Sequence, residues 1–340
     1  MAALPQSKKI MKALVYTGTE EVIFRDEPDP LAANSEVVVK VEASGICGSD
    51  MHAYHGHDER RVPPLILGHE ASGTVVDGQY AGRRMVINPL VSCGLCRDCL
   101  SGRTNLCSVR EIIGMRHAGA FAEFVTIAEK NLIAVPDGLD MVRASIMEPA
   151  AVSLHGIVLA EKVLQRPLSE CSALVIGGGA IGLLAALFLH QKGTSQIMLA
   201  ETSAGRRKTV EQSGCCDVFD PLGKKLPNES SYDLVIDAVG SGATRGDAVR
   251  YTRQGGVISH IGLQDNEPGL DIRKVTLQEI TVMGNYTYTP TDLQAALSAI
   301  ASGAIGSLDW IETRPLSDGD TAFRDIHHNK THAPKIVLLP

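Results

Sequence analysis

The sequence predicts an α/β protein in which a β-rich region is followed by a region of alternating strands and helices. The chain has 340 residues, more than one ordinary hydrophobic core accommodates and about right for two domains. Short β-branched runs, broken by glycine, proline, asparagine or aspartate, fill the first part. From about Val152 onward, apolar runs alternate with longer helical patterns, which predicts βαβ units and a parallel sheet.

In the β-rich region, strands are predicted at residues 11–16, 37–43, 72–76, 84–87 and 121–127. The second region adds strands at 173–176, 197–200, 232–239, 257–261 and 280–284, and the last strand of the chain is predicted at 335–339. A helix is predicted at 180–190 because Gly193 can end it. Another is predicted at 290–301 because Thr289 can cap it and Pro290 suits its first turn.

The composition argues against several classes of protein. The formal net charge is −7 and no basic run is long, which argues against a nucleic-acid surface. The most apolar stretch, residues 173–189, is marginal for a membrane span and contains three consecutive glycines, so a strand, a turn and a helix explain it better. Residues 1–12 lack the apolar core of a secretory signal. We therefore expect a cytoplasmic protein with no membrane or nucleic-acid partner.

Four cysteines lie within one short segment. In a reducing compartment clustered thiols favour metal over disulfides, and four thiolates can enclose one tetrahedral zinc ion. Such a zinc has no open position, so we predict a structural site and not a reaction centre. Taken alone, the segment also permits a zinc-ribbon binding module, against which the acidic charge and the turn described next both argue. The four residues are Cys93, Cys96, Cys99 and Cys107.

A G-x-G-x-x-G motif follows the predicted strand at 173–176 and opens the predicted helix at 180–190, the context that a dinucleotide-binding turn requires. The first glycine permits the tight turn, the second lets the backbone approach a pyrophosphate, and the third lets the helix pack closely on the strand. Free N–H groups at the start of the helix would face the phosphates. The sequence therefore predicts a Rossmann domain. The motif consists of Gly177, Gly178, Gly179, Ala180, Ile181 and Gly182.

The next predicted strand, at 197–200, bears on the identity of the cofactor. Glu201 stands directly after it, where a carboxylate can accept hydrogen bonds from an adenosine ribose and would repel a 2′-phosphate. This predicts NAD in preference to NADP. Arg206 and Arg207 follow closely as further predicted cofactor-binding residues, and they weaken that preference.

A second group of residues, outside the cysteine segment, can also bind zinc. Cys47, His69, Glu70 and Glu148 offer a sulfur, an imidazole and two carboxylates, a sensible mixed ligand set. Each residue taken singly has an ordinary structural explanation, since a lone cysteine is more often buried packing. Spacing alone therefore leaves this second site open.

The order of the motifs is more informative than any one of them. It runs from residues 45–50 (G-I-C-G-S-D) and 68–70 (G-H-E), through the four cysteines, to Glu148-Pro149 and the dinucleotide motif. Over nearly the whole chain this order resembles the zinc-containing medium-chain alcohol and polyol dehydrogenases. Members with two cysteines in the catalytic shell have Cys where this chain has Glu148. The resemblance is therefore to the sorbitol, L-idonate, galactitol-phosphate or threonine dehydrogenase branches.

The resemblance implies a catalytic zinc. Cys47 and His69 would bind it, with Glu70 and Glu148 as ligand or near-ligand carboxylates. Asp50 would orient His69 from behind and fix its tautomer. Zinc with an open position lowers the pKa of an alcohol oxygen, which prepares the alcohol for hydride transfer.

The resemblance also implies a route for the proton and further cofactor contacts. Ser49 would receive the proton of the alcohol and His52 would release it to solvent. Val239, His260 and Ile261 stand at predicted strand ends, on the carboxyl edge of the sheet where such folds bind ligands. They would line the nicotinamide, and ordinary strand-end packing is the alternative.

Two domains are implied. Residues 1–151, completed by 289–340, would form a β-rich GroES-like catalytic domain, and residues 152–288 the Rossmann domain, with the active site between them. The reaction implied is zinc- and NAD-dependent oxidation of a secondary alcohol, a sugar alcohol or related polyol, to the ketone. The family pattern also implies a homodimer or homotetramer, paired across the edge strand at 280–286.

Alternatives for the function remain at this stage. An L-threonine-type or simple alcohol dehydrogenase is one, and a regulator that senses NAD without catalysis is another, against which the complete set of site residues argues. Polyol-specific members often place an arginine between aromatic residues after the last strand of the cofactor domain, whereas this chain has Tyr286-Thr287-Tyr288. A multidentate donor for substrate hydroxyls is therefore missing at this position.

Overall fold

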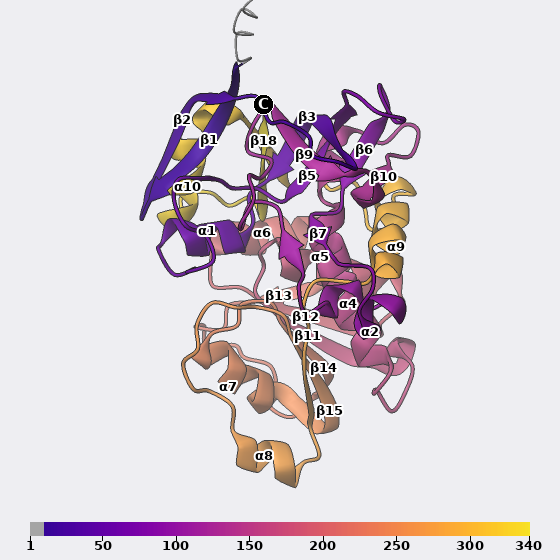
Figure 1. The fold of residues 1–340 in the computed structure, drawn as a ribbon. Helices are drawn as coiled ribbons and strands as arrows, with labels where there is room; N and C mark the ends of the chain where they lie inside the picture. Colours follow the sequence, from indigo (N-terminus) through magenta and orange to yellow (C-terminus); the bar gives the residue numbers. More distant parts are fainter. Residues whose placement is uncertain (1–9) are drawn as a thin grey trace, which may run out of the picture.

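The structure, a computed structural model, describes residues 10–340. Within that range two large sheets of different character organise the chain (Figure 1). One is a mainly antiparallel sheet of seven strands, and the other is a parallel sheet of six. The α/β fold class predicted from the sequence is confirmed.

The seven-stranded sheet has the order β10-β6-β5-β3-β18-β17, and β9 pairs with β3. It joins strands from the first part of the chain to two strands near the C-terminus. Its strands are β3 (Glu36–Gly45), β5 (Glu70–Val75), β6 (Arg84–Ile87), β9 (Phe124–Ala128), β10 (Leu132–Ala134), β17 (Ile311–Pro315) and β18 (Lys335–Leu339).

Two smaller sheets accompany it. A three-stranded sheet has the order β2-β1-β4, and a two-stranded sheet pairs β7 with β8. Their strands are β1 (Ile10–Gly18), β2 (Glu21–Pro28), β4 (Leu65–Ile66), β7 (Leu90–Val91) and β8 (Glu111–Ile112).

The parallel sheet has the order β13-β12-β11-β14-β15-β16, in which the chain starts in the middle and proceeds first to one edge and then to the other. This doubly wound order is that of a dinucleotide-binding fold, with ligands expected at the carboxyl ends of the central strands. Its strands are β11 (Ser172–Ile176), β12 (Gln196–Ala200), β13 (Asp217–Phe219), β14 (Tyr232–Asp237), β15 (Thr252–His260) and β16 (Thr281–Gly284).

The helices connect and cover these sheets. They are α1 (Gly48–Tyr54), α2 (Arg97–Leu100), α3 (Met141–Ser145), α4 (Met147–Glu161), α5 (Ala180–Gln191), α6 (Ala204–Ser213), α7 (Gly242–Tyr251), α8 (Ile272–Leu277), α9 (Pro290–Ala301) and α10 (Gly319–His327). Within residues 10–340, no helix combines the length and the apolar character needed to cross a bilayer.

The predicted helices and strands are present, with small shifts at their ends. The predicted cap of α9 is confirmed, because the Thr289 side chain accepts a hydrogen bond from the backbone N–H of Asp292. The longest strands that the sequence did not predict are β2 and β17, and both lie at the edge of a sheet. Edge strands carry charged side chains and little apolar alternation, which removes the pattern on which a strand prediction depends.

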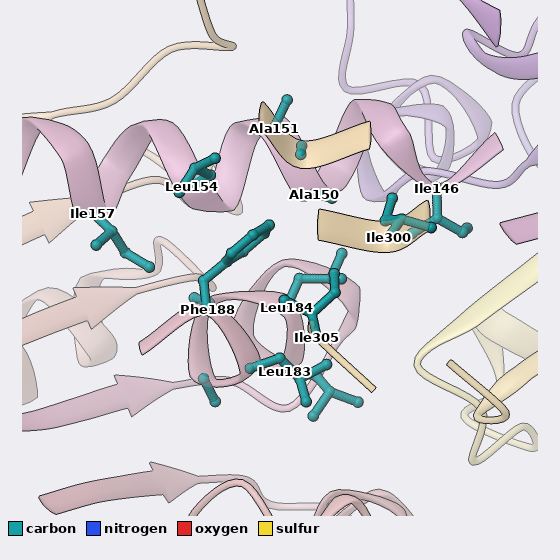
Figure 2. Packing of buried hydrophobic residues seen from close by; sticks show 14 of the residues in the cluster. Ile146, Ala150, Ala151, Leu154, Ile157, Leu183, Leu184, Phe188, Ile300 and Ile305 are labelled. Atoms are coloured by element: carbon teal, nitrogen blue, oxygen red, sulfur yellow. The ribbon is translucent and has the colours of Figure 1, made fainter. Parts of the chain in front are cut away.

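The main core lies where α4 packs against α5 and α9 (Figure 2). Leu154 and Ile157 of α4 face Phe188 of α5, and Ile300 of α9 lies near Ile146 at the start of the helix. Most residues of α4 are buried, which is why this segment is apolar all round. The first turn of α4 carries Glu148, so the core fixes the backbone of a candidate site residue.

Candidate active site

Three adjacent strands bring the first metal-binding candidates together. Gly45, at the end of β3, pairs with Glu70 of β5 on one side and with Val337 of β18 on the other. A Cβ on Gly45 would lie 2.2 Å from Glu70 Oε2, so the close approach requires glycine. The chain then leaves β3 and places Cys47 immediately before α1.

Three of the four predicted ligands of the second zinc converge here. One ligand atom from each of Cys47, His69 and Glu70 lies within 4.8 Å of the other two. His69 and Glu70 are buried, and Cys47 is half-buried. A sulfur, an imidazole and a carboxylate gathered from distant segments at this separation form a donor set that fits zinc.

Glu70 has a strong partner that the sequence did not reveal. The Lys335 ammonium lies 2.7 Å from both of its carboxylate oxygens and also donates a 2.8 Å hydrogen bond to the carbonyl oxygen of Ile46. Burial disfavours the Lys335 cation, but Glu70 outweighs that cost and raises the pKa of the lysine. The buried ion pair links β18 to β5. Both oxygens of the Glu70 carboxylate are bound by Lys335.

Glu148, the fourth predicted ligand, is in a different state. It is 7% exposed, and among the described residues no cation lies within ion-pair distance of it. Burial raises the pKa of Glu148 to about 7; neighbouring His69 opposes this rise and Glu70 adds to it. A buried carboxyl group near the His69 imidazole, with no cation within ion-pair distance, is a favourable place for a metal cation.

Asp50 stands behind the imidazole, as predicted. Its Oδ2 accepts a 3.0 Å hydrogen bond from the backbone N–H of Cys47, and its Oδ1 lies 3.5 Å from His69 Nδ1. Neither Asp50 Oδ1 nor His69 Nδ1 has a hydrogen-bond partner. Burial disfavours the charged imidazole, yet Asp50 and Cys47 raise the pKa of His69 well above its usual value. Asp50 thus favours a ring orientation in which the other nitrogen of His69 is available to a metal.

The structure adds a buried arginine that sequence reasoning missed. Arg61 donates 3.1 Å and 3.0 Å hydrogen bonds to Ser49 Oγ and to the carbonyl oxygen of Gly114, and it pairs with Asp58. It also lies 3.6 Å from Asp50, and its side chain is completely buried. The guanidinium therefore fixes the predicted proton acceptor, Ser49, from one side. An isolated arginine in a loop carries no sequence pattern by which this role could have been found.

His52 lies three residues after Ser49, so both side chains project from one face of α1. Burial is the main cause that lowers the pKa of His52, with His57 as a further cause. A neutral imidazole is the form that can accept a proton. A neutral imidazole is thus favoured on the face of α1 that also carries Ser49.

The glycine motif forms the predicted turn between β11 and α5. Gly177 has φ +101°, and a Cβ on Gly182 would lie 1.8 Å from the carbonyl oxygen of Gly177. These positions therefore need glycine for the positive φ and for the close helix–strand contact. Glu201 accepts hydrogen bonds from the backbone N–H groups of Gly178 at 2.8 Å and Ser203 at 2.7 Å.

The two predicted cofactor-binding arginines, Arg206 and Arg207, have different surroundings. Arg206 lies 3.8 Å from Glu201 Oε2 and lines the cavity at the turn. Arg207 instead donates to the carbonyl oxygens of Glu201 and Thr202 and pairs with Asp220 at 3.2 Å, so its contacts are structural.

Val239, His260 and Ile261 lie at the carboxyl ends of β14 and β15. Val239 touches the turn, since a Cβ on Gly177 would lie 2.6 Å from Val239 Cγ2. His260 Nδ1 lies 3.0 Å from Asp237 Oδ2, and Ile261 is buried.

One cavity joins the metal-binding candidates to the turn. It has a volume of about 250 Å³. Its lining includes Cys47 and Glu70 on one wall and residues 179–182 with Arg206 on the other. A dinucleotide on the turn would therefore extend toward the group of ligands around Cys47.

The four-cysteine segment forms a separate cluster around α2. The sulfur of Cys93 lies 3.6 Å from that of Cys107 and 3.9 Å from that of Cys99. Four sulfurs at about 2.3 Å from one zinc ion would be about 3.8 Å apart, so the observed geometry fits a tetrahedral site. Hydrogen bonds from the backbone N–H groups of Leu95 and Cys96 lower the pKa of Cys93 to about 6, which favours the thiolate.

Comparison with known proteins decides the family. Residues 33–137 match the alcohol dehydrogenase GroES-like domain, and residues 180–302 match the zinc-binding dehydrogenase family. The chain is a zinc-type alcohol dehydrogenase. Its class is therefore that of an oxidoreductase that uses a nicotinamide dinucleotide, and the resemblance found in the sequence is confirmed.

Similar proteins match nearly the whole length of the chain. It is 30% identical to L-galactonate-5-dehydrogenase of Escherichia coli over 94% of this chain and 96% of that protein. It is 29% identical to sorbitol dehydrogenase of Halalkalibacterium halodurans over 97% of this chain and 99% of that protein. Among solved structures, a zinc-binding dehydrogenase of Sinorhizobium meliloti bound to NADP is 28% identical with a TM-score of 0.84, over 98% of this chain and 100% of that one.

Proposed function

We propose that this dehydrogenase oxidises a secondary alcohol of a sugar alcohol or related polyol to the ketone, with NAD as hydride acceptor and zinc at Cys47. The observation that carries the proposal is the single cavity lined by both Cys47 and the dinucleotide turn at 179–182. Hydride transfer requires the alcohol carbon and the nicotinamide to meet, and this cavity is where they can. The two curated relatives act, by their names, on a sugar acid and a sugar alcohol, which are both polyols.

Cys47, His69 and Glu148 would hold the catalytic zinc, which when bound acts as a Lewis acid on the alcohol oxygen. Glu148 is preferred to Glu70 because Lys335 already occupies both oxygens of Glu70. Asp50 keeps the His69 ring in the orientation needed for binding. The Glu70–Lys335 pair in turn fixes the strands from which Cys47 and His69 project.

Ser49 would take the proton from the alcohol. The Arg61 guanidinium donates a hydrogen bond to Ser49 Oγ and so orients that oxygen. The hydroxyl hydrogen of Ser49 is then free to point toward another acceptor. His52, on the same face of α1, accepts the proton in its neutral form and passes it to solvent. Arg61 carries a fixed positive charge and cannot take part as an acid, so it positions Ser49 without exchanging protons.

The dinucleotide would bind with its pyrophosphate at the turn before α5. Free N–H groups at the start of α5 bind the phosphates, and Glu201 accepts hydrogen bonds from the adenosine ribose. The Glu201 carboxylate would repel the 2′-phosphate of NADP, although Arg206 at 3.8 Å reduces that repulsion. If Glu201 sets the preference, Glu201→Ala should weaken NAD binding about tenfold and relax discrimination against NADP. An unchanged ratio would assign the ribose to another group.

A second zinc would bind the four cysteines, giving two per chain. The sulfur separations support this assignment, and the absence of an open position gives the ion a structural role. We also propose the division into a catalytic domain (1–151 and 289–340) and a cofactor domain (152–288). The membership of the two large sheets supports that division.

Assembly and location complete the proposal. Strand β16 is the exposed edge of the parallel sheet, and Val282 on it and Leu277 just before it are 39% and 70% exposed. An exposed edge with apolar side chains is suited to pairing with a second copy, so we propose a homodimer or homotetramer. All eight cysteines are free thiols, which supports the cytoplasm. Mass measurement in solution tests the assembly, and a monomer at micromolar concentration would exclude it.

A substrate panel tests the enzyme itself. The purified protein, loaded with zinc, is mixed with NAD or NADP and with polyols, L-threonine and simple secondary alcohols, and nicotinamide absorbance is followed. We expect oxidation of at least one polyol, its loss after chelation, and two zinc ions per chain. Oxidation of threonine or simple alcohols alone would replace the polyol assignment, and a protein without bound zinc would end the metal assignment.

A further inference from the structure

A second cavity, of about 470 Å³, has the size of a small-molecule site. Three arginines from different segments line it: Arg60 precedes β4, Arg110 follows the four cysteines, and Arg116 follows β8. Tyr286, from the segment after β16, closes another side. Three guanidinium groups that converge on one cavity make it strongly electropositive.

The cavity adjoins the proposed reaction centre through neighbouring residues. Arg61, the chain neighbour of Arg60, donates to Ser49 on one side and to the carbonyl oxygen of Gly114 on the other. Met115 and Arg116, which follow Gly114, line the cavity. Tyr286 stands two residues before Tyr288, whose buried side chain lies beside Glu148. Chain neighbours on two sides therefore connect the lining of the cavity to residues of the proposed reaction centre.

Two of the three guanidinium groups are not neutralised. Arg60 is bound by Asp58 through contacts of 2.8 Å and 2.9 Å. Arg110 donates only to the carbonyl oxygen of Cys107, and it stacks over the Tyr286 ring with 4.5 Å to the ring centre. Among residues 10–340, Arg116 has neither an ion pair nor a hydrogen bond. The one carboxylate in the lining belongs to Glu111, which pairs with His117.

Stacking keeps Arg110 available to an anion. The Tyr286 ring covers one face of the guanidinium and leaves its edge N–H groups directed to other acceptors. Planar N–H groups of this kind bind carboxylate or phosphate oxygens in pairs. Residues 286–288 contain no arginine, and the fold supplies guanidinium groups beside Tyr286 from other segments.

We propose that the substrate is a polyol that carries a terminal anionic group, a carboxylate or a phosphate, bound by Arg110 and Arg116 while the secondary hydroxyl meets the zinc site. This rests on the proposed function and narrows its substrate class. A neutral sugar alcohol would leave the guanidinium groups of Arg110 and Arg116 without a negative partner in the cavity, whereas an anionic group would form ion pairs with them. Binding of the anionic group would also fix the position of the substrate's carbon chain, and therefore which carbon is oxidised.

The test compares hexitols with the hexonates and hexitol phosphates of the same configuration. We expect kcat/KM for an anionic compound to exceed that of its neutral counterpart at least tenfold. Comparison of the hexonates with the hexitol phosphates shows whether the preferred anionic group is a carboxylate or a phosphate. Arg116→Gln and Arg110→Gln should each raise KM for the anion about 10- to 100-fold with little change in kcat. Turnover of the hexitol should fall much less than turnover of the anion. Added salt should reduce the preference in the parent enzyme.

Arg83→Gln is the matched control, because Arg83 stacks over Tyr80 at 5.5 Å outside the cavity and its loss removes the same charge. A neutral hexitol preferred over every anion, or cavity variants that behave like Arg83→Gln, would overturn the proposal while the dehydrogenase assignment stands. If no polyol is oxidised at all, the proposed function fails first. Calorimetry then measures the binding of a hexonate to the enzyme with NADH. The anion site predicts weaker binding in Arg116→Gln than in Arg83→Gln, and equal binding in the two variants would exclude the site.

Discussion

The four-cysteine segment and the centre at Cys47 are both groups of metal ligands, yet they are built in opposite ways. In the segment, Cys93 and Cys107 are 14 positions apart and the backbone between them closes the cluster. In the centre, Cys47 follows β3, His69 precedes β5 and Glu148 lies on α4, and the Glu70–Lys335 pair, 265 positions apart, holds together the sheet of β5, β3 and β18. A local cluster can stabilise a loop, whereas a centre held by distant strands forms only once the fold is complete.

This difference separates the expected consequences of mutation. Loss of a ligand in the segment should lower stability, because the metal closes a loop with few buried apolar residues of its own. Loss of a ligand in the centre should lower turnover, because the surrounding strands and α4 hold the fold in place without the metal.

The largest effect is expected for Cys47→Ala. Turnover should fall by about 10³-fold or more, since the metal would lose its thiolate ligand. The melting temperature and NAD affinity should change little, because Cys47 lies outside the core and outside the glycine turn. Kinetics, zinc content and thermal unfolding measure the three quantities. Wild-type turnover in this variant would remove the centre from the mechanism.

How much the sequence could reveal follows the same contrast. The four cysteines and the glycine turn were predictable from short spacings, since all the groups involved are close in the chain. Cys47, His69 and Glu148 became convincing only through the order of several motifs. Lys335 and Arg61 were not predicted at all, because each acquires its partners from strands or loops that only the folded chain brings near.

Strand prediction failed for a related reason. β17 has the sequence I-E-T-R-P and lies at an edge, where it needs little apolar surface. The strand β14 (Y-D-L-V-I-D) is buried along its whole length and has an apolar centre, from which it was predicted. The second cavity could not be foreseen either, since its arginines are exposed residues in three loops and carry no common period.

The next largest effect is expected for Cys99→Ser, on the other side of the comparison. Cys99 is buried, and loss of its sulfur should release the structural zinc and lower the free energy of unfolding by about 4 kcal/mol. Turnover measured well below the melting temperature should fall less than in Cys47→Ala. Calorimetry and zinc analysis provide the test. A zinc-depleted protein with unchanged melting would contradict the structural role.

Arg61→Lys tests whether a change beside the centre at Cys47 can lower turnover without a large loss of stability. Lysine keeps the charge but cannot reach Ser49, Gly114 and Asp58 together, so a buried network loses contacts. We expect the free energy of unfolding to fall by about 1–3 kcal/mol and kcat to fall more than KM changes. Arg324→Lys, in an exposed pair with Asp320, is the control. Unaltered kcat would show that Ser49 needs no support from Arg61.

The smallest effect concerns a hydrogen bond between the cysteine segment and a wall of the second cavity. Asn105, buried within the cysteine segment, donates a 3.0 Å hydrogen bond through Nδ2 to the carbonyl oxygen of Tyr286, which lines the second cavity. Asn105→Ala should cost about 1 kcal/mol of stability and raise the substrate KM severalfold, with zinc content intact. Titration of the purified variant with substrate and thermal unfolding give both values. If KM stays at the parent value while stability falls, the segment supports the fold only. If KM rises as expected, the structural zinc acts on catalysis at a distance, because it holds the loop that holds a wall of the substrate cavity.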